Sequence, residues 1–114
     1  MSDQHLENMH QMLQDALSPL APCQLGVFDE GTDTQIVYDL QQLSLGGWES
    51  GRPRVAYGTY NVQVYQKNYD PSLPMQCLAA LLEKRIGAAM NGEAFVDSAG
   101  YTVAGLTASL WKEI

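Results

Sequence analysis

The stretch that decides the fold runs from Thr34 to Asn68 and reads TQIVYDLQQLSLGGWESGRPRVAYGTYNVQVYQKN. Two long runs of β-branched and aromatic residues are joined at GGWESGRP, and this arrangement predicts a β-hairpin arm over about residues 34–68. The second run, Pro53 to Gln66, would span about 46 Å, whereas a compact domain of this size is roughly 34 Å across. We therefore expect the hairpin to extend beyond the rest of its own domain.

A projecting two-stranded arm needs a partner, because such an arm is only marginally stable in water. We expect a neighbouring subunit or another protein to contact the hairpin from about Leu43 to Arg54. Trp48 either packs back on its own hairpin or inserts into the partner, where Trp and Arg are enriched among anchor residues. The residues predicted for this interface are Leu43, Leu45, Trp48, Arg52 and Arg54.

The first run of the hairpin changes its alternation pattern. Apolar residues keep one parity as far as Leu40 and then switch to Leu43 and Leu45. Such a change indicates either a β-bulge near Gln41-Gln42, or a strand whose distal half buries its opposite face against something else. On the returning run, residues 60, 62 and 64 form the expected core face.

The opposite face of the returning run carries tyrosines at positions 57 and 65. A row of tyrosines could stack on nucleic-acid bases, but only one basic residue, Lys67, follows it. Single-stranded nucleic acid is bound by aromatic rings together with a basic groove. Packing within a sheet is therefore the favoured interpretation of these tyrosines.

Two helices are expected on either side of the hairpin. Residues 5–17 have apolar side chains at three and four residue spacing, with Ser2 or Asp3 as the N-cap. A second helix should begin after NYDPSLP, capped by Ser72 or Asp70, and end at Asn91-Gly92. Its expected core face comprises Met75, Leu78, Ala79, Leu82, Ile86 and Ala89 or Met90.

Shorter strands complete the predicted sheet. Alternation over Cys23–Phe28 indicates a short strand, at an edge of the sheet, and alternation over Tyr101–Trp111 indicates a closing strand. We therefore predict a single α+β domain over residues 1–114, with a mainly antiparallel sheet, a long projecting hairpin and two helices on one face.

The charge of the chain is unevenly distributed. Its net charge is −7, yet residues 1–51 hold eight acids and no Lys or Arg, while all six basic residues follow. This distribution argues against a phosphate-binding surface on the first half. Two interpretations stay open: a solubilising acidic face, or an acidic edge on one subunit that faces Arg52 and Arg54 of the next.

No sequence motif indicates catalysis, a cofactor or a metal. The chain lacks GxGxxG, a phosphate loop, HExxH and GxSxG. His5 and His10 are five residues apart, about 140° around a helix, which does not suit one metal. The acidic segment Asp29–Asp33 lacks calcium-loop spacing and is expected to be a solvated turn. We therefore predict a protein that is not an enzyme, without catalytic, cofactor-binding or metal-binding residues.

Cysteine usage and hydropathy indicate the compartment. Cys23 and Cys77 are too far apart in sequence for a CxxC pair, and we expect two reduced, mostly buried thiols. No apolar run is long enough to span a bilayer, so no membrane partner is predicted. The acidic, polar start MSDQHLENMH does not look like a secretory signal. We expect the chain to stay in the cytoplasm where it is made.

The layout resembles a known family. An N-terminal amphipathic helix, a run ending in IVYDL, a returning arm YGTYNVQVYQKN, a helix with CLAALLEKRIGAAM and a final strand together resemble the tail-terminator and tail-completion (head–tail joining, neck) proteins of long-tailed bacteriophages. The most telling piece is Tyr60 to Tyr69, because a strand of the YxVQVxxY kind commonly precedes a helix and a closing strand in that family.

The resemblance implies a structural role in virion assembly. Such proteins form a ring, often of six subunits, that caps the tail tube or joins tail to head, with tail-tube or head-connector proteins as partners. DNA passes through the opening without specific binding, and an acidic ring would suit this passage. The expected location is the virion tail or neck, after assembly in the bacterial cytoplasm.

Two other functions stay open on the sequence alone. An acidic adaptor or immunity-like protein would use the first half of the chain to bind a basic partner. A small ligand-binding α+β domain or enzyme would instead need a concave pocket with perturbed acids.

Overall fold

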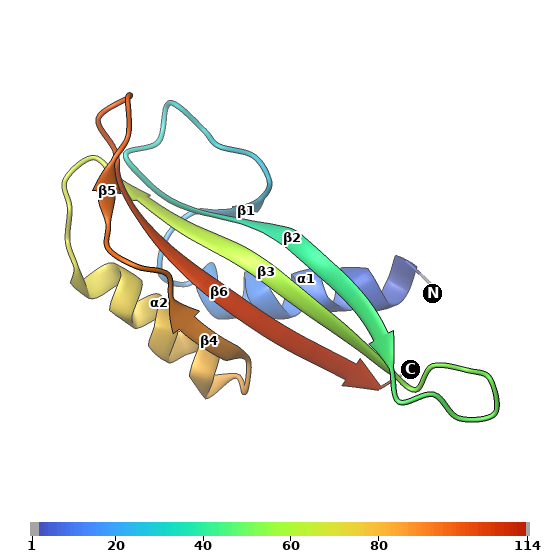
Figure 1. The fold of residues 1–114 in the computed structure, drawn as a ribbon. Coiled ribbons are helices and arrows are strands. Elements are labelled where there is room, and N and C mark those ends of the chain that lie inside the picture. Colours follow the sequence, from blue (N-terminus) through green and yellow to red (C-terminus); the bar gives the residue numbers. More distant parts are fainter. Residues whose placement is uncertain (1–2, 114) are drawn as a thin grey trace.

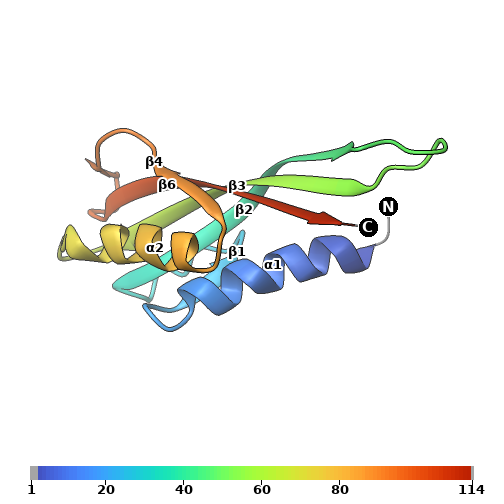
Figure 2. The same ribbon diagram turned by 90° about the horizontal axis from the view of Figure 1, so that it is seen from below.

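The long hairpin forms the centre of a six-stranded sheet, and two helices cover one face of that sheet (Figures 1 and 2). The computed structural model describes residues 3–113, with side chains from residue 8 onward. Ser2, proposed as a cap, and the side chains of Asp3 and His5 lie outside this part. The elements are α1 (Asp3–Leu17), β1 (Cys23–Leu25), β2 (Thr34–Gly46), β3 (Val55–Gln66), α2 (Ser72–Glu83), β4 (Gly87–Met90), β5 (Phe95–Val96) and β6 (Thr102–Glu113). The predicted α+β class is confirmed.

The strand order is β1-β2-β3-β6-β4, and β5 pairs with β6 next to β4. All pairs are antiparallel except β1 with β2, so β1 is the short edge strand that alternation predicted. β6 pairs with the whole length of β3, from Val55 opposite Glu113 to Gln66 opposite Thr102. The prediction of a two-stranded arm is therefore wrong: the arm has three strands, which explains how it stays paired without a partner.

Only the tip of the hairpin projects. The last pair between β2 and β3 joins Gly46 to Val55, and residues 47–54 extend beyond the end of the sheet (Figure 2). The molecule measures 52 × 23 × 23 Å, and its radius of gyration is 15.1 Å, against about 13 Å for a compact domain of this length. The predicted extension beyond the domain is thus confirmed for the tip alone.

A β-bulge explains the change of alternation in β2. Leu40 lies opposite Tyr60, and Gln42 lies opposite Thr59, so Gln41 is the extra residue. Because directly opposite residues in an antiparallel pair point to the same side, Leu43 and Leu45 stay on the helix-covered face. The first of the two interpretations, a bulge near Gln41-Gln42, is confirmed.

The core lies between the sheet and the two helices. α1 packs tightly against Gly58 of β3, since an added Cβ there would lie 3.0 Å from the sulfur of Met9. Residues 60, 62 and 64, the expected core face of β3, are indeed buried, and alternate residues of β6 from Ala104 to Leu110 are buried beside them. The buried core comprises Met9, Leu13, Ala16, Leu17, Ile36, Tyr38, Ala56, Tyr60, Val62, Val64, Cys77, Leu81, Ile86, Ala104, Leu106, Ala108 and Leu110.

The second helix ends earlier than predicted. α2 stops at Glu83, not at Asn91-Gly92, because Arg85 adopts a left-handed conformation with φ of 63°. The N–H of Arg85 donates to the carbonyl of Leu82 (3.0 Å) and that of Ile86 to Leu81 (2.9 Å), which is the Schellman arrangement of a helix end. Residues 87–90 then form β4 instead of the last helical turn.

The buried face of α2 also differs from the prediction. Cys77 and Leu81 are buried, whereas Met75 and Leu82 are 55% and 52% exposed. The helix has apolar residues almost all round, so its packing on the sheet, and not its periodicity, selects the core face. At its start Pro71 makes no side-chain cap, and the Asp70 carboxylate instead accepts the Ser72 N–H at 2.9 Å.

Candidate interaction surface at the hairpin tip

The tip, residues 47–54, is held in shape by a small turn of its own. Glu49 and Arg52 exchange two backbone hydrogen bonds, of 2.9 and 3.0 Å. Between them, Ser50 and Gly51 both have positive φ, 53° and 75°, as a type I′ turn requires. The tip is therefore an ordered continuation of the hairpin.

Trp48 is the most prominent apolar side chain of the tip. It is 63% exposed, so its ring is not packed back on its own hairpin. Apolar side chains of this size in exposed positions are candidates for contact with another molecule, since tryptophan anchors many protein interfaces. The interpretation that Trp48 packs on its own hairpin is therefore wrong, and its insertion into a partner stays a prediction.

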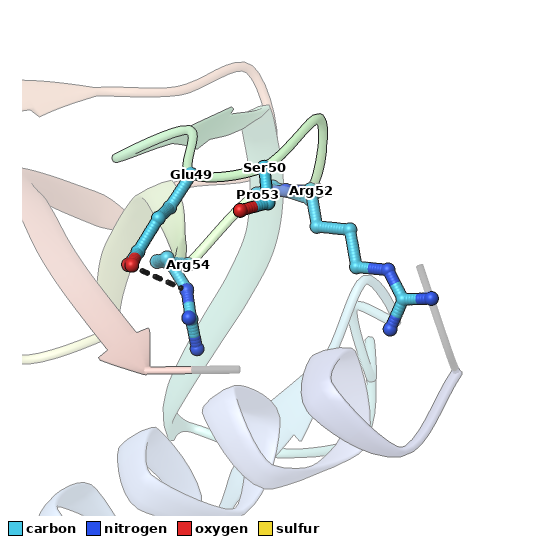
Figure 3. A pocket seen from close by; sticks show the side chains of 5 residues that line it. All are labelled: Glu49, Ser50, Arg52, Pro53 and Arg54. Carbon is cyan, nitrogen blue, oxygen red and sulfur yellow. Dashed lines mark ion pairs between the residues drawn. The ribbon is translucent and has the colours of Figure 1, made fainter.

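Charged side chains surround an open hollow of about 650 Å³ at the tip. Its lining residues are Glu49, Ser50, Arg52, Pro53 and Arg54. The Arg54 Nε atom lies 3.1 Å from a Glu49 carboxylate oxygen, and both side chains are exposed. An exposed pair of this kind contributes at most about 1 kcal/mol. Arg52 points away from this pair into solvent (Figure 3).

The five residues predicted for the interface fall into two groups. Trp48, Arg52 and Arg54 lie together on the tip. Leu43 and Leu45 lie before it, on the helix-covered face of β2; Leu43 is 37% exposed, and Leu45 packs against the core. Their contact with a partner stays a prediction.

Away from the tip, His10 and Cys77 take part in the packing between the helices and the sheet. Within residues 8–113, no group of three or more His, Cys, Asp and Glu side chains could hold a metal ion. The His10 Nδ1 atom lies 2.8 Å from the Tyr60 hydroxyl, between α1 and β3. Cys23 and Cys77 are free thiols, and burial raises the pKa of Cys77 from 9.0 to about 11. A buried, protonated thiol is a poor nucleophile.

Sequence reasoning missed two further exposed surfaces. One is β5, where Phe95 and Val96 are 56% and 70% exposed. The other surrounds Trp111, which is 60% exposed beside the end of α2. The β5 surface could have been found from its two apolar residues, which lie between Glu93 and Asp97 in a loop-like segment. No comparable signal existed for the second, since its residues come from distant parts of the chain.

No protein-family model matches the chain, and no curated protein matches it. In the described part of the chain, no helix is both long enough and apolar enough to cross a membrane.

Proposed function

We propose that this chain is a structural assembly protein that forms an oligomeric ring at the end of a bacteriophage tail tube, as a tail terminator or head–tail connector subunit. The observation that carries the proposal is the projecting tip. It presents an exposed Trp48 with Arg52 and Arg54, outside the sheet that supports it. Tryptophan and arginine are the side chains most enriched at the centres of protein interfaces.

The position of the tip favours contact between subunits. It lies at one end of a molecule 52 Å long, from which it can reach a patch on a neighbour that differs from the tip itself. Contacts between two different patches can close into rings. The net charge of −7 suits a ring through which DNA passes, because acidic surfaces do not retain phosphates.

The proposal predicts that the tip controls assembly and not folding. Combining Trp48→Ala with Arg52→Glu should lower the mass measured by light scattering at a given concentration, while the urea midpoint stays within error of the wild type. Both side chains are exposed, so their loss removes little from the monomer. The matched control is Tyr69→Ala, an exposed aromatic residue outside the tip, which should assemble normally.

Assembly that is unchanged in the Trp48→Ala, Arg52→Glu variant would contradict the role of the tip. A chain that stays monomeric at high concentration but binds a basic protein tightly would favour the acidic adaptor instead.

A further inference from the structure

An exposed apolar segment with acids on both sides forms a knob at one end of β6. The β5 knob, residues 93–97, contains the paired residues Phe95 and Val96, opposite Val103 and Thr102 of β6. Phe95 is 56% exposed and Val96 70%. Glu93 before them is exposed, and Asp97 after them is half-buried. Large apolar side chains this exposed are unusual in a monomer when they adjoin one another.

A groove of complementary character lies further along the same strand. The α2 groove has a volume of about 280 Å³. Ile86 and Leu110 are buried at its floor, at 1% and 4% exposure, and Trp111 is an exposed wall. Lys84 and Arg85 contribute two positive charges, and none of the described residues that line the groove is acidic, although Glu83 is adjacent in sequence. Its lining residues are Met12, Lys84, Arg85, Ile86, Leu110 and Trp111.

Arg85 occupies a backbone position that favours glycine. Its φ of 63° strains the backbone of an ordinary residue, a strain that glycine avoids at the end of a helix. The backbone hydrogen bonds of this helix end do not need the arginine side chain. The side chain lines the groove instead, and we expect it to contribute to binding at the groove.

The edge of β6 next to the groove is also open. β4 pairs with β6 only as far as Ser109, so Leu110–Glu113 have no strand partner on that side among residues 3–113. An extended segment has room to approach this edge, where unpaired backbone groups can accept a further strand.

We propose that the β5 knob of one copy docks in the α2 groove of a second copy. Phe95 would contact the apolar floor, and Glu93 and Asp97 would lie beside Lys84 and Arg85. The charges of the two surfaces are opposite, and both surfaces combine these charges with apolar area. This inference rests on the proposed assembly function and adds a specific contact between subunits to the one proposed for the tip.

The arrangement makes this contact head-to-tail. The knob pairs with β6 at Thr102-Val103, whereas the groove lies beside Leu110 and Trp111 of the same strand. In Figure 1, β5 and the link from α2 to β4 accordingly lie in different parts of the molecule. Each copy therefore presents one knob and one groove, and successive copies can form a ring or a chain.

Two variants separate the two halves of the contact. Phe95→Ser removes the knob's apolar anchor, and Lys84→Glu combined with Arg85→Gly changes the charge of the groove. We expect each to raise the dissociation constant for self-association roughly tenfold or more, measured by sedimentation. Arg85→Gly alone should not destabilise the monomer, because glycine suits its φ. The matched control is Val27→Ser, an equally exposed apolar residue (64%) elsewhere, which should leave association unchanged.

Mixing the variants tests the pairing directly. The Phe95→Ser chain keeps its groove, and the Lys84→Glu, Arg85→Gly chain keeps its knob, so the mixture should form a 1:1 knob-to-groove contact that neither variant can form alone. In a second test, Glu93→Lys should partly restore association to Lys84→Glu. Variants that associate like the wild type, or a wild type that stays monomeric at every concentration, would overturn this contact. If only the Trp48→Ala, Arg52→Glu variant loses assembly, the contact is wrong and the proposed function stands.

Discussion

At the scale of single residues, buried polar side chains fix the loops to the sheet. Gln35 is fully buried. Its side chain accepts the Asp29 N–H at 2.8 Å and donates to the Asp29 carbonyl at 2.6 Å. The Asp29 carboxylate accepts hydrogen bonds from Thr32 and Gly31, which hold the pKa of Asp29 below its usual value. The acidic segment Asp29–Asp33 is thus organised as a turn, the interpretation favoured from its sequence.

The buried thiol of Cys77 should make the fold sensitive to alkali. The pKa of Cys77 is raised by burial from 9.0 to about 11, so the unfolded chain loses this proton at a lower pH than the folded chain. The stability linked to this group is present below about pH 9 and is lost as the pH rises toward 11. In urea titrations, Cys77→Ala should lower the free energy of unfolding at pH 7 and flatten its decline between pH 9 and 11. A decline with unchanged slope in the variant would contradict this.

At the scale of elements, the bulge at Gln41 keeps β2 in register with its partner. Deleting Gln41 should change the free energy of unfolding by less than about 1 kcal/mol, because pairing on both sides of it is already aligned and Leu45 stays on its face. Deleting Ser44 instead turns Leu45 away from the core, which should cost roughly 1 to 2 kcal/mol more. Urea unfolding of the two deletions measures the difference. If both deletions lowered the free energy of unfolding equally, the bulge itself would be important for stability.

Local sequence patterns were sufficient to predict the strands of the hairpin but not the end of α2. The alternation of β2 and β3 identified both strands, because strand periodicity depends on neighbouring residues alone, and it left the bulge as one of two interpretations, between which the register decides. The end of α2 carried no comparable signal. Lys84 and Arg85 are good helix formers, and the apolar spacing continues through Ile86, so only burial of Ile86 beside Leu81 reveals the end.

At the scale of the whole molecule, the pairing of distant segments could not be predicted. The sequence indicated a strand at β6 but not that it pairs with all of β3, since both runs alternate equally well. For the same reason, a candidate surface could be predicted from the sequence only where its residues are contiguous. The tip is a contiguous segment and was identified, whereas the α2 groove combines Met12, Arg85 and Trp111 from three distant elements.

The three-stranded arm should not depend on its tip. We expect that replacing residues 47–54 with Asn-Gly, a pair suited to a two-residue hairpin, leaves the urea midpoint nearly unchanged, because β6 supports β3 as far as Val55. X-ray scattering of the monomer should give a radius of gyration below the 15.1 Å of the full chain. Loss of cooperative unfolding in this variant would show that the tip stabilises the arm.

The pairing of β3 with β6 also sets an order of events during synthesis. β3 acquires one neighbour at once, from the preceding β2, but its other neighbour, β6, leaves the ribosome only after α2, β4 and β5. Until then one edge of β3 is open, and two residues of the α2 groove, Leu110 and Trp111, have not yet emerged. A growing chain therefore lacks both its finished arm and its groove until β6 has been synthesised, and a newly made subunit becomes competent to assemble only after that step.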